Sequence, residues 1–179
     1  MDRKEIKRQL EEMLEAGRSR TETFKAFSGG GVGDRVLAYW IAAYPDRDLY
    51  ETHYRKINTL VTISFIQALL GAVLGYFIGT TIGPNASFIL AAIAGVVPLL
   101  FAYGFYKNSA QAYNIYIVLA ISQLPRLFSG AAEAPLVATA GAVFTLGILF
   151  FVMRLRSLLF PDFAFFGPKK VKGQYVFSN

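Results

Sequence analysis

The sequence predicts an all-α integral membrane protein: a four-helix transmembrane bundle with a small N-terminal cytoplasmic helical subdomain and a short C-terminal interfacial hairpin or strap. Two observations lead to this fold class. Hydrophobic residues make up 54% of the 179 residues and charged residues only 17%, whereas ordinary soluble domains carry about 25% charged residues. The charges are also unevenly placed, because residues 1–56 hold eleven of the eighteen Lys and Arg and ten of the twelve Asp and Glu. We therefore divide the chain into residues 1–55, 56–156 and 157–179.

The N-terminal segment, residues 1–55, is expected to contain about three short helices followed by a juxtamembrane helix. Apolar residues recur at helical spacing over residues 3–16, and Gly17 is expected to end that helix. Ser19 and Glu22 have the spacing of a capping box, in which the serine accepts a hydrogen bond from a first-turn amide. This pattern predicts a short second helix after Ser19.

The third helix is expected to begin at Asp34, a good capping residue, and to end at Tyr44-Pro45. Asp46 and Asp48 then start the juxtamembrane helix. These short helices resemble a DNA-binding helix-turn-helix in spacing only, because the third helix offers few donors for base edges or phosphates. Nucleic acid is therefore not an expected partner, and the segment is expected to pack on the membrane domain or on a protein.

Long apolar runs begin at Ile57 and predict four transmembrane helices. Each run is close to the roughly 20 residues that cross a hydrocarbon layer of about 30 Å, and the third is the shortest. The links between them are brief, so consecutive helices should be antiparallel neighbours. The predicted spans are residues 57–82, 86–106, 110–127 and 135–153.

Lys and Arg gather on one side of this predicted bundle. The link between the first two spans has no charge, and the other link on that side has only Arg126 and Glu133. Because Lys and Arg are enriched in cytoplasmic loops, both termini are expected in the cytoplasm of a bacterial-type inner (plasma) membrane, with the chain crossing several times. The residues on the cytoplasmic side are Arg47, Arg55, Lys56, Lys107, Arg154, Arg156, Lys169, Lys170 and Lys172.

The C-terminal tail, residues 157–179, has two aromatic segments around a basic turn. A small β-hairpin or an extended strap at the cytoplasmic interface would place the rings at the membrane boundary and the lysines near anionic lipid phosphates. A simpler interpretation is an anchor that only sets the topology. The candidate headgroup contacts are Lys107, Arg154, Arg156, Lys169 and Lys170.

Small residues repeat every four positions along the first span and recur in the second and fourth spans. This spacing lets two helix backbones approach closely where no hydrophobic effect drives association. The stripe could pack helices within one chain or form a seam between copies, and both possibilities stay open. The candidate packing residues are Gly71, Gly75, Gly79, Gly83, Ala91, Gly95, Ala134, Ala138 and Ala142.

Polar side chains form a second pattern, in the cytoplasmic halves of the first and third spans. Because amides are costly against lipid, these residues are expected to point into the bundle or into a water-filled recess. They would form either a pocket for a ligand or lipid headgroup, or hydrogen bonds that only hold helices together. The candidate polar pocket consists of Ser64, Gln67, Gln111, Asn114 and Ser122.

The residues needed for catalysis are largely missing from the sequence. The chain has no cysteine and a single histidine, His53, and no Asp, Glu, His or Lys lies within a predicted span. No catalytic residue, metal site or cofactor is therefore expected. The leading hypothesis is a non-enzymatic inner-membrane accessory or scaffold protein that binds a protein partner or lipid through its cytoplasmic side. The alternative is a homo-oligomeric channel or small-solute transporter assembled through the glycine stripe.

Overall fold

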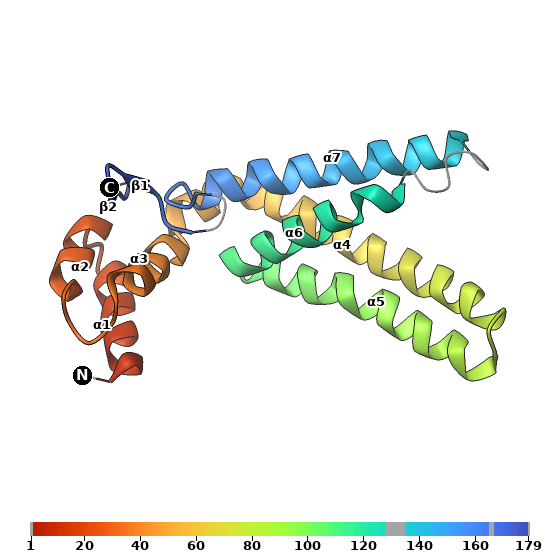
Figure 1. Ribbon diagram of the computed structural model, residues 1–179, viewed down its shortest axis with the longest axis horizontal. Helices are drawn as coiled ribbons and strands as arrows, with labels where there is room; N and C mark the ends of the chain where they lie inside the picture. The colour runs from red at the N-terminus through yellow and green to blue at the C-terminus, as the bar shows by residue number, and fades with distance from the viewer. Residues whose placement is uncertain (1, 128–134, 165–166, 179) are drawn as a thin grey trace. The chain divides into compact units, whose positions relative to one another are not determined.

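The structure is a computed structural model that describes residues 2–127, 135–164 and 167–178 (Figure 1). The chain divides into two compact units. Met1–Leu49 and Arg156–Asn179 form the first, called the terminal unit because it joins the two ends of the chain. Tyr50–Leu155 form the second, called the apolar unit. The sequence had assigned the two ends, residues 1–55 and 157–179, to separate segments.

Three helices make up the N-terminal part of the terminal unit. Gly17, with a φ of 80°, ends the first helix in the left-handed conformation that glycine tolerates best. The Ser19 hydroxyl accepts a hydrogen bond from the Glu22 amide at 3.2 Å and so caps the second. The helices are α1 (Arg3–Glu15), α2 (Arg20–Phe27) and α3 (Asp34–Ala43).

Asp34 does not cap α3 as the sequence suggested. Gly33 occupies the capping position, and Asp34 is the first residue of the helix itself. Its Oδ1 accepts hydrogen bonds from the Ser28 hydroxyl at 3.0 Å and from the Gly29 amide at 3.3 Å. The carboxylate therefore closes the glycine-rich loop between α2 and α3, because its side chain turns back to the loop.

The C-terminal part of the terminal unit contains the hairpin that was one of two predicted forms of the tail. Strands β1 (Lys170–Val171) and β2 (Gln174–Tyr175) pair antiparallel. Lys172 and Gly173, which connect them, both have positive φ, at 49° and 82°. Two consecutive positive φ angles are typical of the tight turns that match the twist of a two-residue hairpin.

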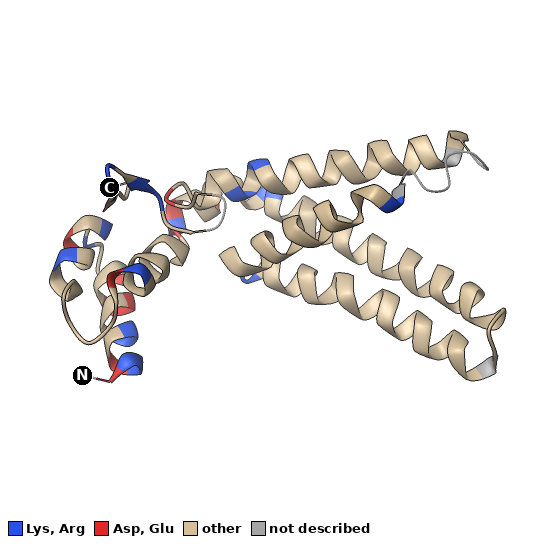
Figure 2. Ribbon diagram, viewed as in Figure 1, with Lys and Arg blue, Asp and Glu red and all other residues tan. Residues whose placement is uncertain are grey.

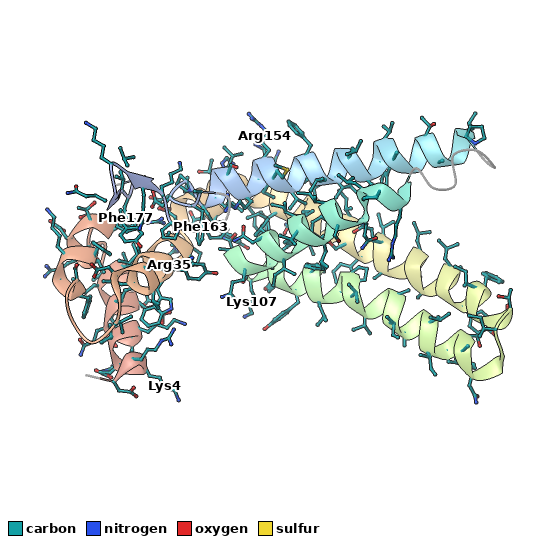
Figure 3. All side chains as sticks on the ribbon, viewed as in Figure 1. Lys4, Arg35, Lys107, Arg154, Phe163 and Phe177 are labelled. Atoms are coloured by element: carbon teal, nitrogen blue, oxygen red, sulfur yellow. The ribbon has the colours of Figure 1, made fainter. Side chains whose placement is uncertain are left out.

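Aromatic rings pack the C-terminal segment on the N-terminal helices. Phe24 of α2 lies 5.6 Å from Tyr175 and 5.5 Å from Phe177, measured between ring centroids. Tyr39 of α3 meets Phe163 edge to face at 5.3 Å. Figure 3 labels Phe163 and Phe177. Aromatic pairs at these distances add stabilisation beyond the burial of their area. The tail rings thus contribute to a protein core.

Four long helices follow. The predicted juxtamembrane helix and the first predicted span form one continuous helix, because no residue between them breaks the pattern. Asp46 caps it by accepting from the amides of Asp48 at 3.0 Å and Leu49 at 3.1 Å. The helices are α4 (Arg47–Thr80), α5 (Pro84–Tyr106), α6 (Ala110–Leu127) and α7 (Pro135–Leu159).

Among the described residues, three helices are long and apolar enough to cross a membrane: α4, α5 and the Ala138–Leu159 part of α7. Figure 2 shows α5 without a charged residue and α4 with charges only in its first turns. These features suggest a membrane protein. The third predicted span, α6, is 18 residues long but is not among the three, because polar residues such as Gln111, Asn114 and Gln123 lower its hydropathy.

Candidate functional site

A buried ion pair lies at the centre of the terminal unit. Arg20 at the start of α2 donates from Nη1 to Oδ2 of Asp162 at 2.6 Å, and the two side chains are only 9% and 3% exposed. The second guanidinium nitrogen donates to the Tyr44 carbonyl at 3.2 Å and lies 3.8 Å from a carboxylate oxygen of Asp46. The pair thus links α2, the end of α3 and the segment after α7.

The second carboxylate oxygen of Asp162 is also satisfied. Its Oδ1 accepts from the backbone amide of Ser178 at 2.6 Å and from the Ser178 hydroxyl at 2.8 Å. The Asp162 backbone carbonyl accepts from the Lys169 amide at 2.8 Å. A buried charge is tolerated only when its partner and its remaining hydrogen-bonding sites are provided, and both conditions hold here.

A groove of about 1010 Å³ borders this ion pair. It brings together the turn between α1 and α2, the link between α3 and α4, and two residues of the C-terminal segment. Three arginines and three acidic residues line it. A ligand that carries only positive or only negative charge would therefore be repelled by some of these residues and attracted by others. The lining residues are Leu14, Glu15, Gly17, Arg18, Ser19, Arg20, Tyr44, Pro45, Asp46, Arg47, Asp48, Leu49, Pro161 and Ser178.

Tyr44 provides a neutral hydrogen-bond donor in this groove. Partial burial raises the pKa of its hydroxyl, and the carboxylates of Glu15 and Glu11 and a hydrogen bond to Glu15 raise it further. The phenol therefore stays protonated at neutral pH and donates to Glu15. The groove combines fixed charges of both signs with hydrogen-bonding groups, an arrangement suited to binding by ion pairs and hydrogen bonds.

The glycine stripe of α4 lies against α5 of the same chain. A Cβ built on Gly71 would lie 2.6 Å from the Ala94 carbonyl oxygen, and one on Gly75 would lie 2.6 Å from the Leu90 carbonyl oxygen and 3.1 Å from the Ala91 Cα. A Cβ on Gly79 would overlap the backbone of Ser87. No side chain fits at these positions, because the two backbones touch there.

The remaining small residues are placed as follows. Gly95 of α5 faces Ala72, whose Cβ would be 3.2 Å from a Cβ on the glycine, so it belongs to the same contact. Gly83 precedes α5 and has nothing within 4 Å of such a Cβ, so it is not part of the contact. Ala142 of α7 is buried and Ala138 is half-buried, while Ala134 lies outside the described residues. A seam between copies through these glycines would require α4 and α5 to separate.

The five polar pocket candidates differ in burial and in their hydrogen-bond partners. Ser64 is buried and donates to the Leu60 carbonyl of its own helix at 3.0 Å. Gln67 is hydrogen-bonded to Tyr116 of α6. Asn114 is half-buried, whereas Gln111 and Ser122 are exposed, the latter donating to the Leu119 carbonyl at 2.7 Å.

The α6 stripe was expected to point into the bundle or into a water-filled recess, and Gln111 and Ser122 are not buried in the bundle. Aromatic packing accounts for the difference, because the rings of Tyr113 and Tyr116 occupy the inner face of α6. Their centroids lie 4.8 Å and 5.6 Å from that of Phe105 on α5. These larger side chains bury more apolar area than the stripe could, and they set the rotation of the helix.

The basic residues proposed to contact lipid headgroups fall into two groups. Lys107, Arg154, Lys169 and Lys170 are exposed, with Lys170 lying 4.5 Å from the ring centroid of Tyr175. Arg156, in contrast, is 7% exposed, donates to the Ala164 carbonyl at 2.5 Å and stacks on Phe163. Arg156 is thus part of the terminal unit's core and is not placed to bind a headgroup.

The turn between α5 and α6 contains a buried amide. Asn108 adopts a φ of 49°, the left-handed conformation that commonly follows a helix, and it is 4% exposed. Neither its Oδ1 nor its Nδ2 has a hydrogen-bond partner among the described residues. Leaving a polar group buried and unpaired costs about 1–3 kcal/mol.

We therefore expect Asn108→Gly to increase the free energy of unfolding by about 1–2 kcal/mol, because it removes the amide and suits the positive φ. Asn108→Ala is the control, since it removes the amide but keeps the strain of a Cβ at positive φ. Its free energy of unfolding should therefore increase less than that of the glycine variant. Thermal unfolding in detergent measures both. A glycine variant less stable than the natural protein would mean that the amide is paired.

The residues of the ion pair were not predicted as a site. The available signal was that Asp162 is one of two acidic residues after position 56, in a segment otherwise rich in aromatic residues. An acid in such surroundings needs a cationic partner, but the sequence does not identify which arginine provides it. Arg20 lies 142 positions away.

Within the described ranges, no group of three His, Asp or Glu could hold a metal ion. No protein family model matches the chain, and no curated protein or solved structure is significantly similar to it.

Proposed function

We propose that this protein is a four-span protein of a bacterial-type inner membrane whose two ends combine into one cytoplasmic docking module for a protein partner. Its role would be that of a non-enzymatic accessory or scaffold component. The observation that carries this proposal is the buried pair between Arg20 and Asp162, which joins the N-terminal helices and the C-terminal segment in one unit.

The number of membrane crossings follows from this unit. A folded unit can lie on only one face of a bilayer, so an even number of crossings must separate Leu49 from Arg156. Three helices have the length and composition of spans. One more crossing is needed, and α6 lies between α5 and α7 in the chain. Its 18 residues measure about 27 Å, close to the thickness of the hydrocarbon core.

The placement of Lys and Arg supports a cytoplasmic terminal unit. With four crossings, Lys107 in the turn between α5 and α6 lies on the same side as the terminal unit, and so do Arg55 and Arg154. The turn between α4 and α5 has no charged residue. Short loops rich in Lys and Arg stay in the cytoplasm.

The groove of the terminal unit is the proposed docking surface. Its lining contains both arginines and acidic residues, and Tyr44 and the Ser19 end of α2 add hydrogen-bonding groups. A polypeptide segment that carries both signs of charge is complementary to such a lining, whereas a purely anionic lipid phosphate would also face Glu15, Asp46 and Asp48. This favours a protein partner over a lipid.

The topology can be tested directly because the chain contains no cysteine. Single cysteines at Thr81 and Glu133 should react with an impermeant maleimide added to intact cells, and single cysteines at Lys107 and Lys172 should react only after the membrane is opened. If Thr81→Cys is labelled in intact cells and Glu133→Cys is not, α6 does not cross the membrane. Labelling of Lys172→Cys in intact cells would place the terminal unit outside.

The docking role is tested by purification in mild detergent, with the partner identified by mass spectrometry. The wild type and the Lys172→Glu control, altered on the exposed hairpin, should retain the same protein, and Arg18→Glu in the groove should lose it. Both substitutions change the charge equally. Recovery of no stoichiometric partner, or equal retention by the two variants, would contradict the proposed docking surface.

A further inference from the structure

The C-terminal hairpin has one face packed on the terminal unit and one face uncovered. Side chains alternate between the two faces of a strand. Tyr175 packs on Phe24 of α2, with 5.6 Å between the ring centroids. Val171 pairs with Gln174, the neighbour of Tyr175, and so points to the opposite face. Val171 and Val176 expose 57% and 45% of their surface. The uncovered face of the hairpin is therefore partly apolar.

Lysines surround these two valines. Lys169, Lys170 and Lys172 are exposed, and within the described ranges none of them forms an ion pair. No acidic residue follows Asp162, whose own charge is paired with Arg20 (Figure 2). We call the three lysines and the two valines together the basic hairpin face. Its charge has a single sign.

Backbone hydrogen bonding holds the hairpin close to the end of α7. The Lys169 amide donates to the Asp162 carbonyl at 2.8 Å, and Asp162 is three residues beyond Leu159, where α7 ends. Three residues span at most about 11 Å, so Lys169 lies within roughly 15 Å of the end of α7. The Ala138–Leu159 part of α7 is one of the helices that are long and apolar enough to cross a membrane. The surface of a membrane that α7 crosses is therefore close to the hairpin.

We infer that the basic hairpin face binds the surface of the bilayer that α7 crosses, through the phosphates of anionic lipids. The negative surface potential of such a bilayer attracts nearby lysines, and the attraction decays over a Debye length of about 8–10 Å. The two exposed valines add apolar contact at the boundary between headgroups and hydrocarbon. The rings of Phe163, Tyr175 and Phe177 take no part, because they pack inside the terminal unit.

Two features favour lipid over a protein partner at this face. The basic hairpin face carries only positive charge, whereas the groove of the terminal unit carries both signs. The hairpin is also attached next to a candidate membrane span, which keeps lipid phosphates at a high effective concentration around it. The contact is separate from the groove, and it requires only that α7 lies in the bilayer.

Environment-sensitive fluorescence tests the inference, because the chain has no cysteine of its own. Val171→Cys, labelled with a nitrobenzoxadiazole maleimide, is reconstituted in phosphatidylcholine vesicles with and without phosphatidylglycerol. The anionic lipid should shift the emission to shorter wavelength and raise its intensity at least twofold. Salt at about 1 M, which shortens the Debye length to about 3 Å, should reverse both changes. Ala26→Cys, exposed on α2, is the control label and should respond to neither.

Charge variants of the labelled chain identify the groups responsible. Lys169→Gln with Lys172→Gln should remove most of the response to phosphatidylglycerol. Lys170 is kept in this variant, because it lies over an aromatic ring of the hairpin and its loss would disturb the packing. Lys4→Gln with Lys7→Gln, on the exposed surface of α1, removes the same charge and should preserve the response.

Equal emission of the Val171→Cys label in neutral and anionic vesicles would overturn the inference, and so would equal responses of the hairpin and α1 variants. A blue shift that appears only when a protein partner is added, whatever the lipid, would assign the basic hairpin face to that protein instead. Neither the number of membrane crossings nor the recovery of a partner on the groove affects these measurements, so their outcome is distinguishable from failure of the proposed function.

Discussion

Truncation of Asp162 to alanine is expected to destabilise the terminal unit by about 3–5 kcal/mol, because it removes the buried carboxylate from the Arg20 guanidinium and leaves only the more exposed Asp46, 3.8 Å away. The two side chains are 9% and 3% exposed, so water cannot replace the lost partner. Ser178 would lose its acceptor at the same time. The C-terminal segment should detach from α2 and become sensitive to protease.

The measurement is urea-dependent proteolysis of the C-terminal segment in membranes. An exposed pair provides the matched control: Arg8 and Glu12 of α1 approach to 2.8 Å with side chains 61% and 56% exposed. Glu12→Ala should leave the stability almost unchanged, because solvent screens the interaction. Similar effects of the two substitutions would show that the Arg20 pair does not hold the unit together.

A double replacement separates the cost of the unpaired charge from the value of the pair. Arg20→Met with Asp162→Leu removes both charges and should recover most of the stability lost in Asp162→Ala, since buried pairs are often replaceable by apolar residues. Recovery would mean that the pair adds little net stability. Its main role would then be to specify that the two ends of the chain join. No recovery would mean that the hydrogen bonds to Tyr44 and Ser178 contribute more than the charge pairing.

Gly75→Ala is expected to destabilise the contact of α4 with α5 by about 1–3 kcal/mol, the usual cost of overfilling a packed site. The new Cβ would lie 2.6 Å from the Leu90 carbonyl oxygen and 2.9 Å from its carbon, both of them backbone atoms that cannot rotate away. The two helices would have to move apart over several turns.

The glycine-to-alanine substitution at Gly147 of α7 is the control, and its effect on stability should have the opposite sign. A Cβ there meets nothing within 4 Å, so alanine should stabilise the helix by about 0.5–1 kcal/mol through its lower conformational entropy. Thermal unfolding in detergent compares the two variants. Equal changes in the unfolding temperature of the Gly75 and Gly147 variants would mean that α4 and α5 are not in contact at the glycines.

Several elements were predictable because their signals are local along the chain. The limits of α6, residues 110–127, and the first residue of α7, Pro135, agree with the predicted spans. The Ser19 cap also follows from neighbouring residues, and so does the hairpin, which was one of the two predicted forms of the tail. In each case the decisive interaction joins positions fewer than five apart, so no knowledge of the remaining chain is needed.

The orientation of α6 illustrates what that reasoning cannot decide. The cost of amides against lipid predicted that Gln111 and Ser122 would face the bundle or a water-filled recess, and the structure leaves both side chains exposed. The competing contact of Tyr113 with Phe105 depends on which helix α6 packs against, and periodicity along one helix cannot decide that. From the sequence, either of two faces of α6 could have packed against another helix, and only the position of the neighbouring helix decides between them.

Hydropathy and charge placement along the chain are enough to divide this protein into apolar helices and charged flanks, because transfer between water and hydrocarbon depends on each residue in turn. The joining of the two ends through Arg20 and Asp162, 142 positions apart, is of a different kind. A buried charge selects a partner by geometry, and only the folded backbone brings one of the ten arginines in the chain within 2.6 Å of that carboxylate.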